Sequence, residues 1–270
     1  MIKDTFFSLP RFMNLCRKEM VENWRSNVLR MVLMYGVMAV VMVWNGYFEY
    51  RYWHSGQIED PAWTFLLVVF IWSLWGFGCL SASFTMEKMK TKTSRTSMLM
   101  VPATPFEKFF SRWFVFTVVF LISYKLADYT RLIIYSLAYP EKDFIAPVAL
   151  SHVFGDEKYY TLCNSGLEFG ALMSGYFFVQ SLFVLGSSIW PKNSFLKTFA
   201  AGTIIGIIYF LVGALVSKML LENGRYYSGG IFESKDTVLW IIIVAGILFT
   251  LLNWTLAYFR FKESEIINRM

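Results

Sequence analysis

Three charged residues, Lys125, Asp128 and Arg131, lie in an otherwise apolar stretch of the sequence and recur every three residues. If that stretch is a helix, the spacing places them on one side of it. Charged groups are costly in hydrocarbon, so they usually mark a transport pathway or pair with one another. We favour pairing, in which Asp128 neutralises the two cations, because the apolar run weakens after Tyr124 and the helix would emerge early into the outer interface.

The chain has few other side chains in patterns that could bind a metal or act in catalysis. The chain has two histidines, His54 and His152, and three cysteines, Cys16, Cys79 and Cys163, without CxxC or HExxH spacing. It has no GxxxxGK(S/T) stretch and no LSGGQ-like signature, so the usual ATP-binding loop is missing. We therefore predict no metal site, no cofactor and no catalytic residue, and hence no enzymatic activity in this chain.

The composition indicates a membrane protein. Hydrophobic residues make up 56% of the 270 positions and charged residues only 16%, which leaves too much apolar surface for a soluble domain to bury. Six apolar stretches approach the roughly 20 residues that cross a bilayer as a helix. We predict an all-α fold with a six-helix transmembrane domain over 31–258, its spans near 31–48, 64–84, 113–135, 170–190, 197–217 and 238–258.

The basic residues predict which side each loop faces. Residues 1–30, 85–112 and 191–196 and the tail 259–270, together with Lys197, hold 17 Lys and Arg against 7 Asp and Glu. The opposite loops hold 6 against 11. By the positive-inside rule the first set is cytoplasmic, so both termini lie inside and the number of spans is even. We expect a multi-pass protein of the cytoplasmic (inner) membrane. The net charge of +6 therefore reflects sidedness and not nucleic-acid binding.

The N-terminal segment 1–30 predicts an amphipathic elbow helix. Its basic residues fall on faces other than the apolar one, so the helix would lie on the inner leaflet with these residues toward anionic membrane lipids. It either only orients the first span or also contacts a cytoplasmic partner. The apolar residues at helical spacing are Leu9, Phe12, Met13, Cys16, Met20 and Trp24.

The cytoplasmic loop 85–112 is the most informative segment. A basic run is followed by four adjacent apolar residues, 98–101, which suggests burial against the inner leaflet or in a partner's groove. Thr104 to Glu107 then form a capping box with a proline in the first turn, which predicts a helix that begins near Pro105 and continues into the third span. The candidate partner-binding residues are Arg95, Met98, Leu99, Met100, Val101, Pro102, Pro105 and Glu107.

The order of elbow helix, six spans, inside termini and a basic loop ending in MLMVPATPFEKFFSRW resembles the type-2 ABC transporter permeases. The resemblance covers nearly the whole chain in topology and residues 95–113 in motif. It implies a homodimer, or a heterodimer with a second permease, that docks on separate ABC ATPase subunits. The segment 94–101 would be the main coupling helix, with 191–194 as a second contact. The outer loop 136–169 is longer than in many members.

Two other classes of function fit the same sequence. One is a non-transporting membrane scaffold or sensor that recruits partners through the elbow helix and the cytoplasmic loop. The other is a secondary transporter that uses the charges of the third span, although internal repeats and pairs of broken helices are not visible.

Polar and small residues within the spans predict helix packing. We expect Gln180 and Asn253 to hold helices together and not to bind substrate. Gly202 and Gly206 form a GxxxG pair, which permits the close approach of another helix within the chain or in a dimer.

Overall fold

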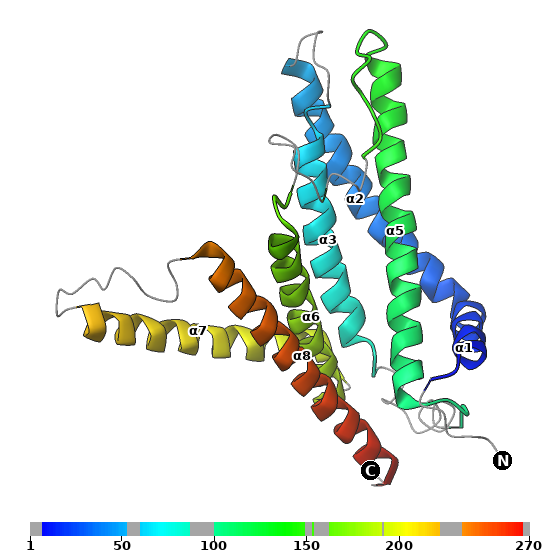
Figure 1. Cartoon of the computed structure of the whole chain (residues 1–270). Coiled ribbons are helices and arrows are strands. Elements are labelled where there is room, and N and C mark those ends of the chain that lie inside the picture. Colours follow the sequence, from blue (N-terminus) through cyan, green and yellow to red (C-terminus); the bar gives the residue numbers. More distant parts are fainter. Residues whose placement is uncertain are drawn as a thin grey trace. The chain divides into compact units, whose positions relative to one another are not determined.

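The structure is a computed structural model that describes residues 7–52, 60–86, 100–148, 153, 162–190, 192–221 and 234–266. Within these ranges, six α-helices are long and apolar enough to cross a membrane, and a shorter amphipathic helix precedes them (Figure 1). The all-α fold is confirmed, as are six helices long and apolar enough to span a membrane. The helices are α1 (Leu9–Glu22), α2 (Trp24–Tyr52), α3 (Trp63–Ser83), α5 (Pro105–Ala138), α6 (Gly166–Ile189), α7 (Ser194–Leu221) and α8 (Lys235–Ile266).

Each predicted span lies inside one helix or matches it to within a residue at an end. Several helices are longer than the apolar run, because the backbone hydrogen bonds of a helix continue past the point where its side chains become polar. α5 is the clearest case: it begins at Pro105, as the capping box predicts, and has 34 residues. At 1.5 Å per residue it is about 51 Å long, more than a bilayer core requires.

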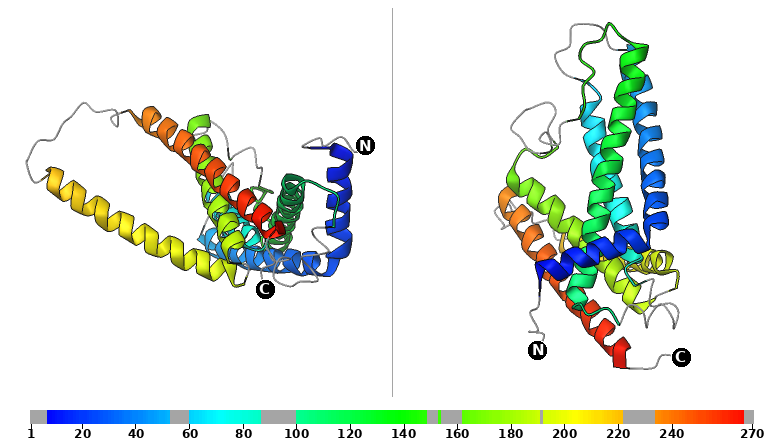
Figure 2. Two further views of the ribbon diagram at one scale, coloured as in Figure 1. Left: turned by 90° about the horizontal axis from the view of Figure 1, so that it is seen from below. Right: turned by 90° about the vertical axis from the view of Figure 1, so that its right-hand side faces the viewer.

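The N-terminal segment forms a helix of its own. α1 ends at Glu22 and α2 begins at Trp24, with Asn23 between them as the residue that ends α1. α1 runs crosswise to both α2 and α5 (Figure 2). The chain therefore changes direction sharply before its first spanning helix, whereas the placement of α1 on a membrane surface stays a prediction.

The chain divides into two compact units. The first comprises residues 1–81 and 102–166 and the second comprises 82–101 and 167–270. In the first unit α5 packs along α2 (Figure 1). The two helices approach closely where Gly46 of α2 faces the ring of Tyr135, whose hydroxyl donates to the carbonyl oxygen of Val43.

Gly46→Ala is expected to destabilise this packing. A Cβ atom at Gly46 would lie 2.5 Å from Cε2 of Tyr135, so the ring and its hydrogen bond must shift. Gly36→Ala on the same helix is the matched control, because nothing lies within 4 Å of a Cβ atom there. Both variants gain the same helix propensity, so the difference between their unfolding free energies measures the cost of the clash alone. We expect the Gly46 variant to be less stable by about 1–3 kcal/mol. Thermal unfolding in detergent measures it, and equal midpoints would contradict the contact.

The second unit contains α6, α7 and α8. Asn253 of α8 donates to the hydroxyl of Ser181 on α6 at 2.9 Å, so it holds two helices together as expected. Gln180 does not, since its amide nitrogen donates to Tyr176 of its own helix at 3.2 Å. Among the described residues, no atom of another helix lies within 4 Å of a Cβ built at Gly202 or Gly206, so their GxxxG face is open.

Candidate functional site

A buried network of ionised and polar side chains lies in the first unit, where α2 ends and α3 begins. We call Tyr50, Asp60, Asp128 and Arg131 the Arg131 network, and all four are fully buried. Tyr50 is in the last turn of α2. Asp60 lies three residues before the start of α3, and one of its oxygens accepts from the amide of Ala62 at 3.0 Å. This local bond is only part of what Asp60 does.

Arg131 is the centre of the network. Its Nη1 donates to Asp60 Oδ2 at 2.9 Å, and its Nε and Nη2 both donate to Asp128 Oδ1, at 3.2 and 2.9 Å. Nη2 also donates to the carbonyl oxygen of Ala146 at 2.7 Å. A guanidinium presents five N–H donors in a fixed plane, and three of its nitrogens are used here. The arrangement satisfies a charge whose burial would otherwise be very costly.

Tyr50 completes the network from α2. Its hydroxyl lies 2.8 Å from both carboxylate oxygens of Asp60, to which it donates, and it accepts from Nη1 of Arg131. Its ring lies 4.9 Å from that of Tyr135 on α5, centroid to centroid. One side chain thus links the end of α2 to both α5 and the segment before α3.

The backbone that follows α5 is bound to the same network. The amide of Val148 donates to Asp128 Oδ2 at 2.8 Å, and the amide of Ala146 lies 3.3 Å from Asp60 Oδ2. Lys125 Nζ donates to the carbonyl oxygen of Val148. This differs from the expected pairing, because Asp128 pairs with Arg131 while Lys125 bonds to backbone. The segment that follows α5 is therefore held against the helix ends.

Sequence reasoning missed Asp60 as a partner of Arg131. The two residues are 71 positions apart, so no local pattern connects them. The available signal was an acidic residue at the predicted outer end of one span and an excess cation near the outer end of another. Among the described residues, no three His, Cys, Asp or Glu side chains converge as metal ligands would. The carboxylates of the network accept hydrogen bonds, which suits a structural role.

A second buried charge lies at the opposite end of α5. The predicted capping box is confirmed: the amide of Glu107 donates to Thr104 Oγ1 at 3.2 Å, and the amide of Thr104 donates to Glu107 Oε2 at 3.1 Å. Glu107 also accepts from Arg11 Nε at 2.7 Å, from Arg11 Nη2 at 2.8 Å and from the amide of Ser8 at 2.8 Å. We call Ser8, Arg11, Thr104 and Glu107 the Glu107 cluster. It joins the first turns of α1 and α5.

Apolar contacts extend this junction along α1. Phe12 and Cys16 are buried against Val115 and Phe110 of α5, and the rings of Phe12 and Phe110 lie 5.1 Å apart. Burial raises the pKa of the Cys16 thiol, which keeps it protonated and slow to react. The expected apolar face of α1 is therefore split, with part of it against α5. The remainder is exposed, and it comprises Leu9, Met13 and Met20 of α1 together with Trp24, the first residue of α2.

The other candidate partner-binding residues precede α5. Arg95, Met98 and Leu99 lie outside the described residues. Met100 is 79% exposed, and it is followed by Val101, Pro102 and the capped start of the helix at Pro105. The two histidines of the chain, His54 and His152, also lie outside the described residues.

Comparison with known proteins identifies no relative of this chain. No family model matches the chain, and neither the curated proteins nor the solved structures contain a match.

Proposed function

We propose that this chain is the permease subunit of an ATP-driven (ABC-type) transporter of the inner membrane, both of its termini being cytoplasmic. It would form a dimer, with itself or with a second permease, and work with a separate ATPase subunit to move a substrate across the membrane. Six apolar helices, the basic and apolar loop 85–104 and the absence of an ATP-binding motif in the sequence support the proposal. The observation that carries it is the Glu107 cluster.

The Glu107 cluster lies where the cytoplasmic loop becomes α5. Because Glu107 lies in the first turn of α5 and accepts from Arg11 of α1, a displacement of the loop end moves α1 and α5 together. α5 is continuous from Pro105 to Ala138, so the displacement reaches the Arg131 network near its other end. There the network connects α5 to the end of α2 and the start of α3. A partner that moves the loop could thus shift three spanning helices at once, which is what an external ATPase requires.

Replacement of the apolar residues of the loop is expected to uncouple the partner. Met98→Asp with Leu99→Asp, or Met100→Asp alone, puts charge where a partner's groove would bury apolar side chains. The chain should still be inserted and folded, but it should retain at most about a tenth of the co-purified ATPase, equal to a loss of about 1.4 kcal/mol. Met98→Leu with Leu99→Met keeps the apolar surface and is the control. Full retention of the ATPase by the charged variants would remove the coupling assignment.

The proposal as a whole is tested by affinity purification of the intact chain in a mild detergent. A P-loop ATPase should be recovered with it, and its hydrolysis rate should change when the permease is bound. A clean preparation that never contains an ATPase would count heavily against a transporter of this class.

A scaffold or sensor is the alternative that the structure keeps open, because the exposed residues of α1 present an apolar surface beside the Glu107 cluster. Such a protein would recruit a partner without moving a substrate. ATP-dependent transport in proteoliposomes that contain both subunits would separate the two functions. A secondary transporter is less well supported, since Asp128 already accepts from Arg131 and from the amide of Val148.

A further inference from the structure

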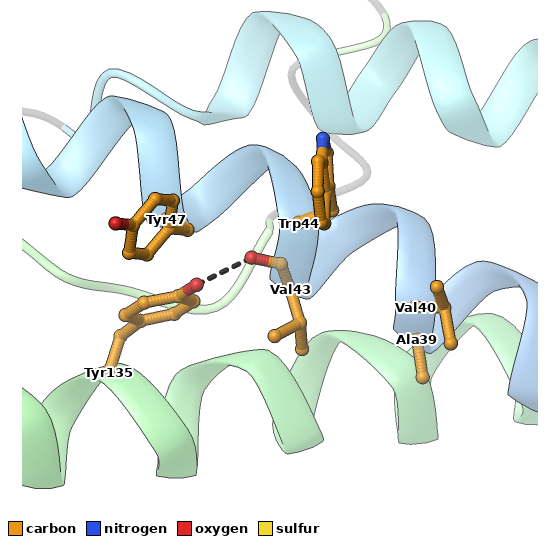
Figure 3. A pocket seen from close by; sticks show the side chains of 6 residues that line it. All are labelled: Ala39, Val40, Val43, Trp44, Tyr47 and Tyr135. Atoms are coloured by element: carbon orange, nitrogen blue, oxygen red, sulfur yellow. Dashed lines mark hydrogen bonds between the residues drawn. The ribbon is translucent and has the colours of Figure 1, made fainter.

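An apolar groove lies on the first unit between α2 and α5, with a volume of about 550 Å³ (Figure 3). Both helices are candidate membrane spans. Val40 and Trp44, which line the groove, are each 69% exposed, so it opens to the surface of the spanning segments. A surface of a spanning segment that no other helix covers would face lipid. The lining residues are Ala39, Val40, Val43, Trp44, Tyr47 and Tyr135.

The groove has one apolar end and one end with polar groups. Figure 3 shows Ala39 and Val40 at the first end, and Tyr47 and Tyr135 at the second. The hydroxyl of Tyr135 is already bonded to the backbone of α2. Trp and Tyr side chains are typical of the interface between hydrocarbon and headgroups. The polar end therefore lies at headgroup depth, close to the last turn of α2.

Arg51 lies one turn beyond Tyr47, at this polar end. Its Nη1 donates to the hydroxyl of Tyr47 at 2.7 Å, and its guanidinium lies 5.7 Å from the ring of Tyr47 and 5.9 Å from that of Tyr52. The side chain is exposed, and no carboxylate of the described residues forms an ion pair with it. A guanidinium has five N–H donors and matches a phosphate bidentately, so most of its donors remain available to an anion.

We propose that this groove binds an anionic phospholipid, one acyl chain lying along α2 and α5 and the phosphate bound by Arg51. The apolar lining suits a hydrocarbon chain, and its size falls in the range of ordinary ligand sites. The charge of Arg51 at headgroup depth selects lipids with a net negative charge over zwitterionic ones, because a choline or ethanolamine ammonium cancels the phosphate charge. If a helix of a second copy occupied the groove instead, it would need an acidic side chain at the position of the phosphate to pair with Arg51.

Native mass spectrometry of the delipidated full chain tests the site, with titration of dioleoyl phosphatidylglycerol or dioleoyl phosphatidylcholine. We expect one phosphatidylglycerol to be retained per chain, with about fivefold preference over phosphatidylcholine, as one arginine near a membrane surface supplies about 1 kcal/mol. Arg51→Gln should abolish the preference and Arg51→Lys should keep it. Val40→Trp should fill the groove and lower the occupancy by both lipids.

Two control variants lie away from the groove. Arg260→Gln removes an exposed cation of α8 that does not line the groove. Val32→Trp adds the same ring at another exposed position of α2. Neither should change lipid retention, and thermal unfolding shows that each variant is folded. Equal retention of the two lipids by the wild type, or no change in Arg51→Gln, overturns the proposal. So does a Val40→Trp variant that turns dimers into monomers with lipid retention unchanged, since a second copy would then cover the groove.

Discussion

Arg131→Met is expected to lower the unfolding free energy by about 3–5 kcal/mol, because it leaves Asp60 and Asp128 buried without their counter-charge. The hydroxyl of Tyr50 and the carbonyl of Ala146 also lose a donor. Burial of an unpaired charge costs more than the net contribution of an intact pair, so the loss should exceed that of any surface substitution. The thermal midpoint in detergent, at one fixed heating rate, should fall by about 6–20 °C.

Two further variants show whether the charge itself is responsible. Arg131→Met combined with Asp60→Asn and Asp128→Asn removes every charge from the network and should recover much of the loss. Arg131→Lys keeps the charge but not the planar donor geometry, so its midpoint should lie between those of the wild type and Arg131→Met. Arg260→Met, at an exposed position, should change the free energy by less than about 1 kcal/mol. A midpoint of Arg131→Met equal to that of Arg260→Met would contradict the network.

Glu107→Ala is expected to release α1 from α5, with a loss of about 2–3 kcal/mol. The substitution removes the acceptor of Arg11, of the Ser8 amide and of the Thr104 amide. Hydrogen bonds to a charged group contribute about 1.5–3 kcal/mol each, but Arg11 is partly exposed and can regain water, so the losses do not add fully. The helix cap at Thr104 also loses one of its two bonds.

Cys16 reports this release directly, because it is buried in the junction between α1 and α5. In a chain with Cys79→Ala and Cys163→Ala, a maleimide should label Cys16 about 30-fold faster after Glu107→Ala, since labelling follows the opening of α1 and about 1.4 kcal/mol is tenfold. Glu22→Gln, at the exposed end of the same helix, is the control and should leave the rate nearly unchanged. Equal labelling of the two variants would show that Glu107 does not hold α1.

These two expected results concern the two ends of one helix. Glu107 connects the start of α5 to α1, and Arg131 connects its far part to α2 and to the segment before α3. If the proposed transporter function is correct, Glu107→Ala should also weaken the effect of permease binding on the ATPase. The charged loop variants act on the partner contact itself, so they should lose the ATPase, whereas Glu107→Ala should retain it with less change in its rate.

Local patterns in the sequence were sufficient for the helices. Long apolar runs predicted the six spanning helices, because backbone groups in hydrocarbon must form their hydrogen bonds within the segment. The capping box at Thr104 predicted the first residue of α5, since all of its bonds join residues at most three positions apart. The predicted ends of several other helices were less accurate. Hydropathy records where side chains become polar, and α2 continues to Tyr52 past that point.

The sequence by itself determined that the chain is helical, that six of its helices can span a membrane and that its third apolar stretch carries a cost in buried charge. Only the tertiary structure decided what offsets that cost: Asp60 reaches Arg131 across 71 positions, Lys125 bonds to backbone, and Glu107 holds Arg11 across 96 positions. The physical reason is the distance along the sequence over which each kind of interaction acts. Helix formation and capping depend on neighbours within a few residues, whereas the partner of a buried charge is whichever group the packing of helices brings within about 3 Å.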